Sequence, residues 1–114
     1  MLVETEFLLA LVTTVAVEAP AVLLILKYLI GFKGASPAKI LSTAALASCL
    51  TLPYLWFVLP PYVDARLYIL IGEAFVVLVE AIVYNRLLGL DIIKSVLLSA
   101  AANMLSFLAG LIVL

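Results

Sequence analysis

Two glutamates lie near the centres of long apolar segments. Glu18 is about twelve residues from either end of the first such segment, and Glu80 lies at a similar depth in the third, which in a helix is near the middle of a bilayer. A charged side chain there costs about 2.5–3.5 kcal/mol or more. Two carboxyl groups at one depth therefore indicate a site for a cation, a proton or a substrate.

Small polar residues recur at helical spacing on one face of the second and the fourth apolar segments. Such faces let helix backbones approach and place hydroxyl and amide groups between helices. For Ser99 and Ser106 we expect packing to be the main role. Glu73 precedes Glu80 by seven residues and shares its helical face. The predicted ion- or ligand-binding residues are Glu18, Glu80, Asn103, Glu73, Ser48 and Thr51.

The same residues allow two other interpretations. A protonated glutamate is a neutral group that can link helices by a hydrogen bond to Asn103 or Ser48, and its role is then structural. Carboxylate oxygens are also the ligands that hard divalent cations prefer. A metal site, if there is one, would use Glu18, Glu73 and Glu80.

The composition excludes several kinds of chemistry. The chain has no histidine and one cysteine, so imidazole ligation, His-based acid–base catalysis and an intrachain disulfide are absent. Serine and cysteine have no obvious activating base except glutamate, so we expect neither an enzyme nor a cofactor. The net charge of −1 argues against binding of nucleic acid, which requires a basic patch.

The elements that carry these residues follow from hydropathy. Hydrophobic residues make up 68 % of the 114-residue chain, against roughly 45–50 % in soluble domains. A chain this small cannot bury so much apolar surface in water, which predicts a single membrane domain over residues 1–114. Four apolar segments are long enough to cross a ~30 Å hydrocarbon core, and lipid requires each to be helical. The predicted all-α fold has transmembrane helices at 7–30, 39–59, 67–90 and 92–114.

Residues typical of helix ends separate the four segments. A glycine after the first segment predicts a helix end, and a Ser-Pro pair predicts the N-cap and first turn of the second helix. A proline pair predicts the end of the second helix, and aspartates predict the starts of the third and fourth. These residues are Gly31, Ser36, Pro37, Pro60, Pro61, Asp64 and Asp91.

The two halves of the chain resemble each other at their rare polar positions. Glu18 and Glu80 each stand between valine and alanine, and the second and fourth segments match at a constant offset. The matched pairs are Lys39 with Lys94, Ala44 with Ser99, Ser48 with Asn103 and Thr51 with Ser106. We interpret this as a parallel repeat of two helical hairpins, 7–59 and 67–114. The alternative is that Leu- and Ala-rich helices align by chance.

The basic residues predict the orientation. Five of the six flank the first and third connections between segments, which the positive-inside rule places in the cytoplasm. They are Lys27, Lys33, Lys39, Arg86 and Lys94. We therefore expect a multi-pass protein of the cell membrane with both termini extracytoplasmic, and Tyr84 in an interfacial belt at the cytoplasmic side.

Midplane carboxyl groups beside hydroxyl and amide groups, in repeated halves, predict a cation- or proton-coupled transporter or channel. Four helices enclose little space, so we expect a homo-oligomer. The alternative is a non-transporting membrane scaffold, or a subunit of a larger membrane complex, in which the glutamates are hydrogen-bonding links. The expected partners are the lipid bilayer, a cation or proton, and a second copy or another membrane protein.

The predicted orientation can be tested by cysteine accessibility. In a Cys49→Ala background, Glu4→Cys should react with an impermeant thiol reagent added to intact cells, and Ala35→Cys should be protected, because the basic connections face the cytoplasm. The opposite labelling pattern would reverse the orientation.

Overall fold

The computed structural model describes residues 2–54, 57 and 65–113 as a bundle of four helices, which confirms the predicted all-α class. The first helix continues into a wider π-helical turn before it ends. The elements are α1 (Leu2–Leu24), η1 (Ile25–Ile30), α2 (Pro37–Pro53), α3 (Ala65–Leu88) and α4 (Ile92–Val113). The predicted end of the second helix at Pro60-Pro61 and the cap at Asp64 lie outside the described residues.

The helix ends described by the structure have the expected chemistry. Gly31 ends η1 in the left-handed region at φ +73°, where a side chain is disfavoured. The Ser36 hydroxyl accepts a hydrogen bond from the Lys39 amide at 3.2 Å and caps α2. At the start of α4, Asp91 Oδ1 accepts one from the Lys94 amide at 2.8 Å.

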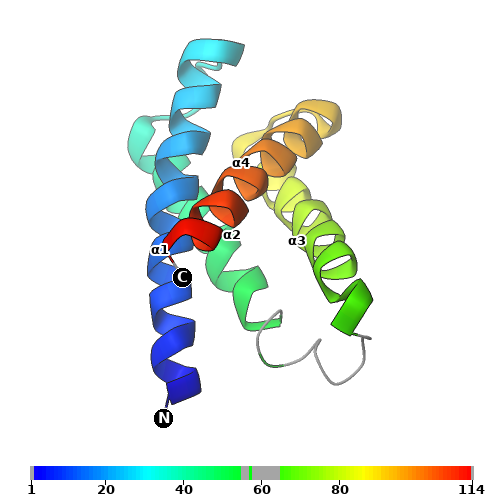
Figure 1. Cartoon of the computed structure of the whole chain (residues 1–114). Helices are drawn as coiled ribbons and strands as arrows, with labels where there is room; N and C mark the ends of the chain where they lie inside the picture. Colours follow the sequence, from blue (N-terminus) through cyan, green and yellow to red (C-terminus); the bar gives the residue numbers. More distant parts are fainter. Residues whose placement is uncertain (1, 55–56, 58–64, 114) are drawn as a thin grey trace.

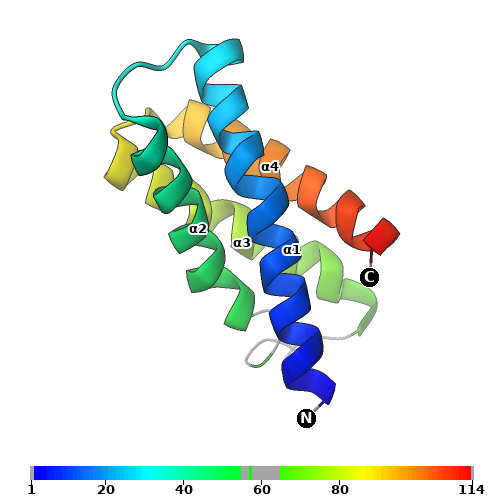
Figure 2. The same cartoon turned by 90° about the vertical axis from the view of Figure 1, so that its left-hand side faces the viewer.

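The four helices form a closed ring of contacts. α1 packs against α2 and α4, and α3 packs against the same two helices, as Figures 1 and 2 show. The bundle is 41 Å along its longest axis and 23 × 21 Å across. Each helix therefore has one face toward two neighbours and one face outward.

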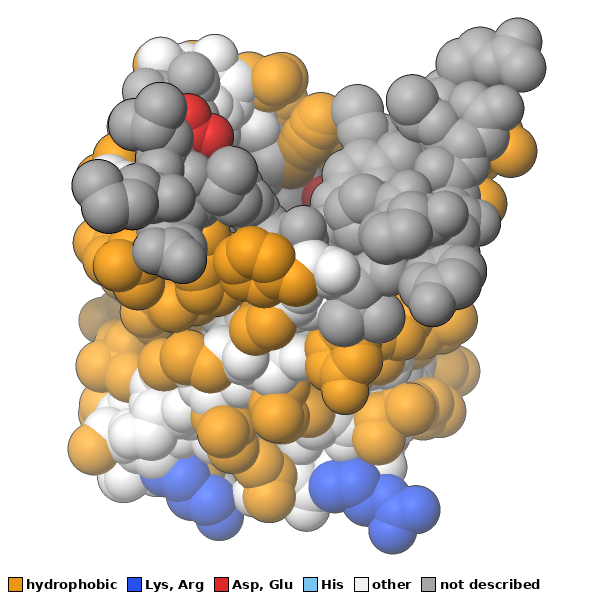
Figure 3. Space-filling model, turned by 90° about the horizontal axis from the view of Figure 1, so that it is seen from below, with side chains coloured by type: hydrophobic (Ala, Val, Ile, Leu, Met, Phe, Trp, Pro, Cys, Tyr) orange, Lys and Arg blue, Asp and Glu red, His pale blue; other side chains and the backbone are white. Residues whose placement is uncertain are grey.

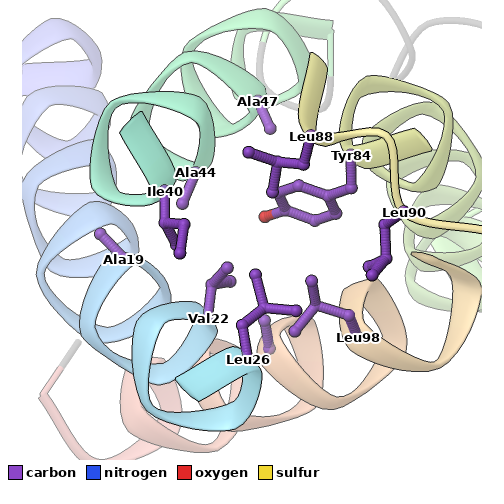
Figure 4. Close-up of a cluster of buried hydrophobic side chains, with 11 residues drawn as sticks. Ala19, Val22, Leu26, Ile40, Ala44, Ala47, Tyr84, Leu88, Leu90 and Leu98 are labelled. Carbon is purple, nitrogen blue, oxygen red and sulfur yellow. The ribbon is translucent and has the colours of Figure 1, made fainter. Parts of the chain in front are cut away.

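A cluster of apolar side chains fills the end of the bundle that lies toward η1. Val22, Leu26 and Ile40 are fully buried there and surround the ring of Tyr84 (Figure 4). The prediction that Tyr84 lies in an interfacial belt is wrong, since this side chain is 0 % exposed. It follows Glu80 by four residues and therefore lies on the inward face of α3.

Small side chains are common in the core of the bundle, and large aliphatic side chains are common on its outside. Many of the buried positions hold alanine or serine, and large aliphatic side chains cover the outside, with Leu29 82 % and Ile112 86 % exposed. Within the described residues, Thr5–Ile30 and Ile92–Ile112 are long and apolar enough to cross a membrane. The spanning bounds of the other two predicted segments stay a prediction.

Replacing a small buried residue with a larger one should destabilise the bundle. Ala102 is fully buried in the apolar cluster, whereas its neighbour Ala101 is exposed. Ala102→Leu should lower the free energy of unfolding by about 1–3 kcal/mol because the added atoms force the helices apart. Ala101→Leu, the matched control, should change it little. Thermal unfolding in detergent micelles measures both, and equal effects would contradict the observed packing.

Candidate functional site

Glu80 is a buried carboxyl group with a hydrogen-bond donor at each oxygen. The Thr51 hydroxyl of α2 donates to Glu80 Oε2 at 2.9 Å, and the Asn103 amide of α4 donates to Oε1 at 3.0 Å. Asn103 Nδ2 also donates to the Ser99 carbonyl at 2.8 Å, which uses its second hydrogen. Glu80 on α3 is thus held by both helices that flank it.

Glu18 is equally buried but less completely hydrogen-bonded. The Ser106 hydroxyl of α4 donates to Glu18 Oε2 at 2.6 Å. Within the described part of the chain, Glu18 Oε1 has no hydrogen-bond donor, although both glutamates are only 1 % exposed. A buried acceptor without a donor is costly, so this oxygen calls for a specific explanation.

The two carboxyl groups line the same space. Glu18 on α1 and Glu80 on α3 both contribute to one cavity inside the bundle. Because a carboxylate has only acceptor atoms, a hydrogen bond between them requires a proton on one of them. The pair therefore has the geometry to hold and release a proton or, without the proton, to attract a cation.

A small cavity adjoins the pair. Its volume is about 90 Å³, which leaves room for several water molecules. Glu73, predicted to lie near the pair toward one end of α3, is half-buried and lines this cavity together with both other glutamates. The remaining lining residues are Thr14, Thr51, Leu52, Val76, Asn103, Ser106 and Phe107.

An apolar groove between α3 and α4 shares two polar residues with this cavity. Its volume is about 440 Å³, and it is lined mainly by apolar side chains, among them Leu70, Met104 and Phe107. Glu73 and Asn103 line both spaces. The surroundings of Glu73 are therefore apolar on one side and polar on the other.

The structure places the predicted site residues as follows. It brings Glu18, Glu80, Thr51 and Asn103 together, with Glu73 at the cavity. Ser48 is buried one turn before Thr51, but its hydroxyl has no hydrogen-bond partner among the described residues, and it does not line the cavity.

The sequence did not predict the hydrogen bond from Ser106 to Glu18 or the burial of the Tyr84 hydroxyl. Ser106, which we expected mainly to pack, donates to Glu18, and its match with Thr51 in the proposed repeat was the available signal. The Tyr84 hydroxyl is buried without a hydrogen-bond partner among the described residues and points toward the middle of the bundle (Figure 4).

The residues that the structure describes contain no group of three or more acidic, cysteine or histidine side chains arranged to hold a metal ion. The three glutamates that line the cavity therefore do not form such a group. Comparison with protein-family models, with curated proteins and with solved structures finds no match. The case for a function thus depends on the residues themselves.

The hydroxyl contact with Glu80 should carry measurable stability. Thr51→Val keeps the shape of the side chain but removes the donor to a buried carboxyl oxygen, which should cost about 1–3 kcal/mol of unfolding free energy. Thr43→Val is the matched control, because among the described residues the Thr43 hydroxyl bonds only to the Lys39 carbonyl of its own helix, at 2.7 Å. Equal losses in the two variants would show that the contact with Glu80 contributes nothing.

Proposed function

We propose that this chain is an integral membrane protein whose four helices all span the bilayer, and that it works as a cation- or proton-coupled transporter or channel. The observation that carries the proposal is the pair of buried carboxyl groups beside a cavity that both of them line. Intramembrane carboxyl groups are costly, and they commonly mark an ion pathway.

The small residues at the helix contacts and the large apolar residues on the outside support the membrane location. In lipid there is no hydrophobic force between helices, so small residues at the contacts and large apolar residues outside are the favourable arrangement. Figure 3 shows hydrophobic side chains over a broad band of the surface and Lys and Arg side chains gathered at one edge. The longest dimension of 41 Å matches about 40–45 Å for a bilayer with its headgroups.

The hydrogen bonds support the parallel repeat. Ser106 on α4 donates to Glu18 on α1, and Thr51 on α2 donates to Glu80 on α3. Exchanging the two proposed hairpins converts the first contact into the second. A pseudo-two-fold axis along the membrane normal would then pass between the two carboxyl groups, with the site at the interface of the repeats.

The proposed orientation keeps both termini extracytoplasmic and the connection between η1 and α2 in the cytoplasm, by the positive-inside rule. The cavity of about 90 Å³ is too small for a continuous pathway within one copy. We therefore propose a homo-oligomer, in which a second copy completes the route for the ion.

A second candidate function is that of a scaffold or subunit in a larger membrane complex. The three donors from α2 and α4 favour it, because interhelical hydrogen bonds of this kind hold helices together in lipid. The cavity beside the carboxyl groups favours transport over this alternative, because a purely structural link needs no space for water.

Flux measurements test the transport proposal. Purified protein in liposomes should move protons or a monovalent cation under an imposed gradient, and Glu18→Gln/Glu80→Gln should abolish that flux. Glu6→Gln, at an exposed position on the same helix as Glu18, is the matched control and should behave as the native chain does. Absence of flux for protons, Na⁺, K⁺ and Mg²⁺ in the native protein would favour the scaffold.

A further inference from the structure

The hydrogen-bond donors around the two carboxyl groups are unequally divided. Glu80 accepts from Thr51 at Oε2 and from Asn103 at Oε1, which is the environment of an ionised carboxylate. Glu18 accepts one bond, from Ser106 at Oε2, and its Oε1 has no donor among the described residues. A proton on Glu18 Oε1 gives this oxygen a hydrogen to donate across the cavity that Glu18 shares with Glu80.

The charged groups near the pair also favour a proton on one of the two carboxyl groups. From α3, Glu18 is faced by Glu80, Glu73 and Tyr84; within the described residues, α2 and α4 contribute only hydroxyl and amide groups. The ion pair between Lys94 and Asp91 lies at the exposed start of α4. With no facing cation, two adjacent ionised carboxylates would repel each other strongly in an apolar interior.

The two buried hydroxyl groups nearby do not supply the missing donor. Ser48 Oγ and the Tyr84 hydroxyl are each buried, and neither makes a hydrogen bond to Glu18 or to any other described group. In the proposed repeat, Ser48 corresponds to Asn103. A serine side chain is shorter than an asparagine side chain, so the contact that Asn103 makes with Glu80 has no counterpart at Glu18.

We propose that the pair holds one proton, carried on Glu18 Oε1 and donated to Glu80, and that this proton is the ion that the protein exchanges. The identification of the exchanged ion rests on the proposed function, whereas the position of the proton does not. Loading forms an O–H bond at Glu18 Oε1 and breaks one O–H bond of a hydronium ion, which becomes water. Release is the reverse step, in which the Glu18 O–H bond breaks and a water molecule takes up the proton as hydronium.

The cavity brings a third carboxyl group beside the pair. Glu73 lines the same cavity as Glu18 and Glu80 and lies seven residues nearer the start of α3 than Glu80, so in this proposal it passes the proton between the pair and that end of the bundle. In this proposal Glu80 is the ionised partner, because it accepts hydrogen bonds from donors on both α2 and α4. The pair therefore changes its charge by one when Glu18 is loaded.

Two glutamine variants distinguish the carboxyl groups. In Glu18→Gln, the side-chain oxygen accepts from Ser106 and the amino group donates to Glu80, so the protonated state is imitated and the midpoint of thermal unfolding should change by less than about 2 °C. In Glu80→Gln, the side chain keeps one acceptor oxygen for the two donors, Thr51 and Asn103. Its amino group then faces one of these donors, and two donors meet without an acceptor between them. That midpoint should fall by roughly 4–8 °C.

Infrared spectroscopy detects directly whether a carboxyl group is protonated. In a Glu73→Gln background at neutral pH, the carbonyl band of a buried protonated carboxyl group should be present. It should persist in Glu80→Gln and disappear in Glu18→Gln. A band that disappears in Glu80→Gln and persists in Glu18→Gln, or no band in the parent, would overturn the assignment.

The outcomes for the proton and for transport are separable. If the band follows Glu18 but liposomes show no proton flux, the assignment of the proton stands and the transport proposal fails. If the band is absent and Na⁺ flux depends on the pair, transport stands and the proton is the wrong ion. A Glu18→Gln variant that retains native proton flux would overturn the exchange at Glu18.

Discussion

The constraint on which the rest of the structure depends is the burial of two carboxyl groups without a facing cation among the described residues. Each carboxyl group can then be stabilised only by donors from neighbouring helices or by a proton. Ser106, Thr51 and Asn103 supply those donors from α4 and α2 to glutamates on α1 and α3. Because each contact joins two helices at one level, the set fixes the rotation and depth of all four.

This network requires helices that approach closely, and the residue sizes provide for that. Alanine and serine occupy many of the buried positions, while the long aliphatic side chains lie outside. The Ser99 hydroxyl, one turn from Asn103, donates to the Val77 carbonyl at 2.9 Å and ties α4 directly to the backbone of α3. The network would loosen if the helices were separated by larger buried side chains, since hydroxyl groups reach only a short distance.

The sequence predicts the helices and the central glutamates because both depend on patterns along one chain segment. Apolar length and helix-end residues specify the four helices, and helical spacing places Thr51 and Asn103 on inward faces. Contacts between side chains of different helices are harder to predict, because they depend on how the helices cross and rotate. For this reason the buried position of Tyr84 could be found only in the structure, and the match of Ser106 with Thr51 suggests a donor role for Ser106 without showing which group it reaches. Ser48 lies beside the network, and its hydroxyl has no partner among the described residues.

The proposed duplication gives two carboxyl groups related positions but not identical surroundings. If Asn103 had its counterpart at Ser48, each glutamate would accept two donors, and nothing would distinguish them as proton carriers. The shorter serine leaves one oxygen of Glu18 without a donor, while Glu80 remains fully bonded. The difference between one amide and one hydroxyl therefore makes one carboxyl group a fixed acceptor and leaves the other free to exchange.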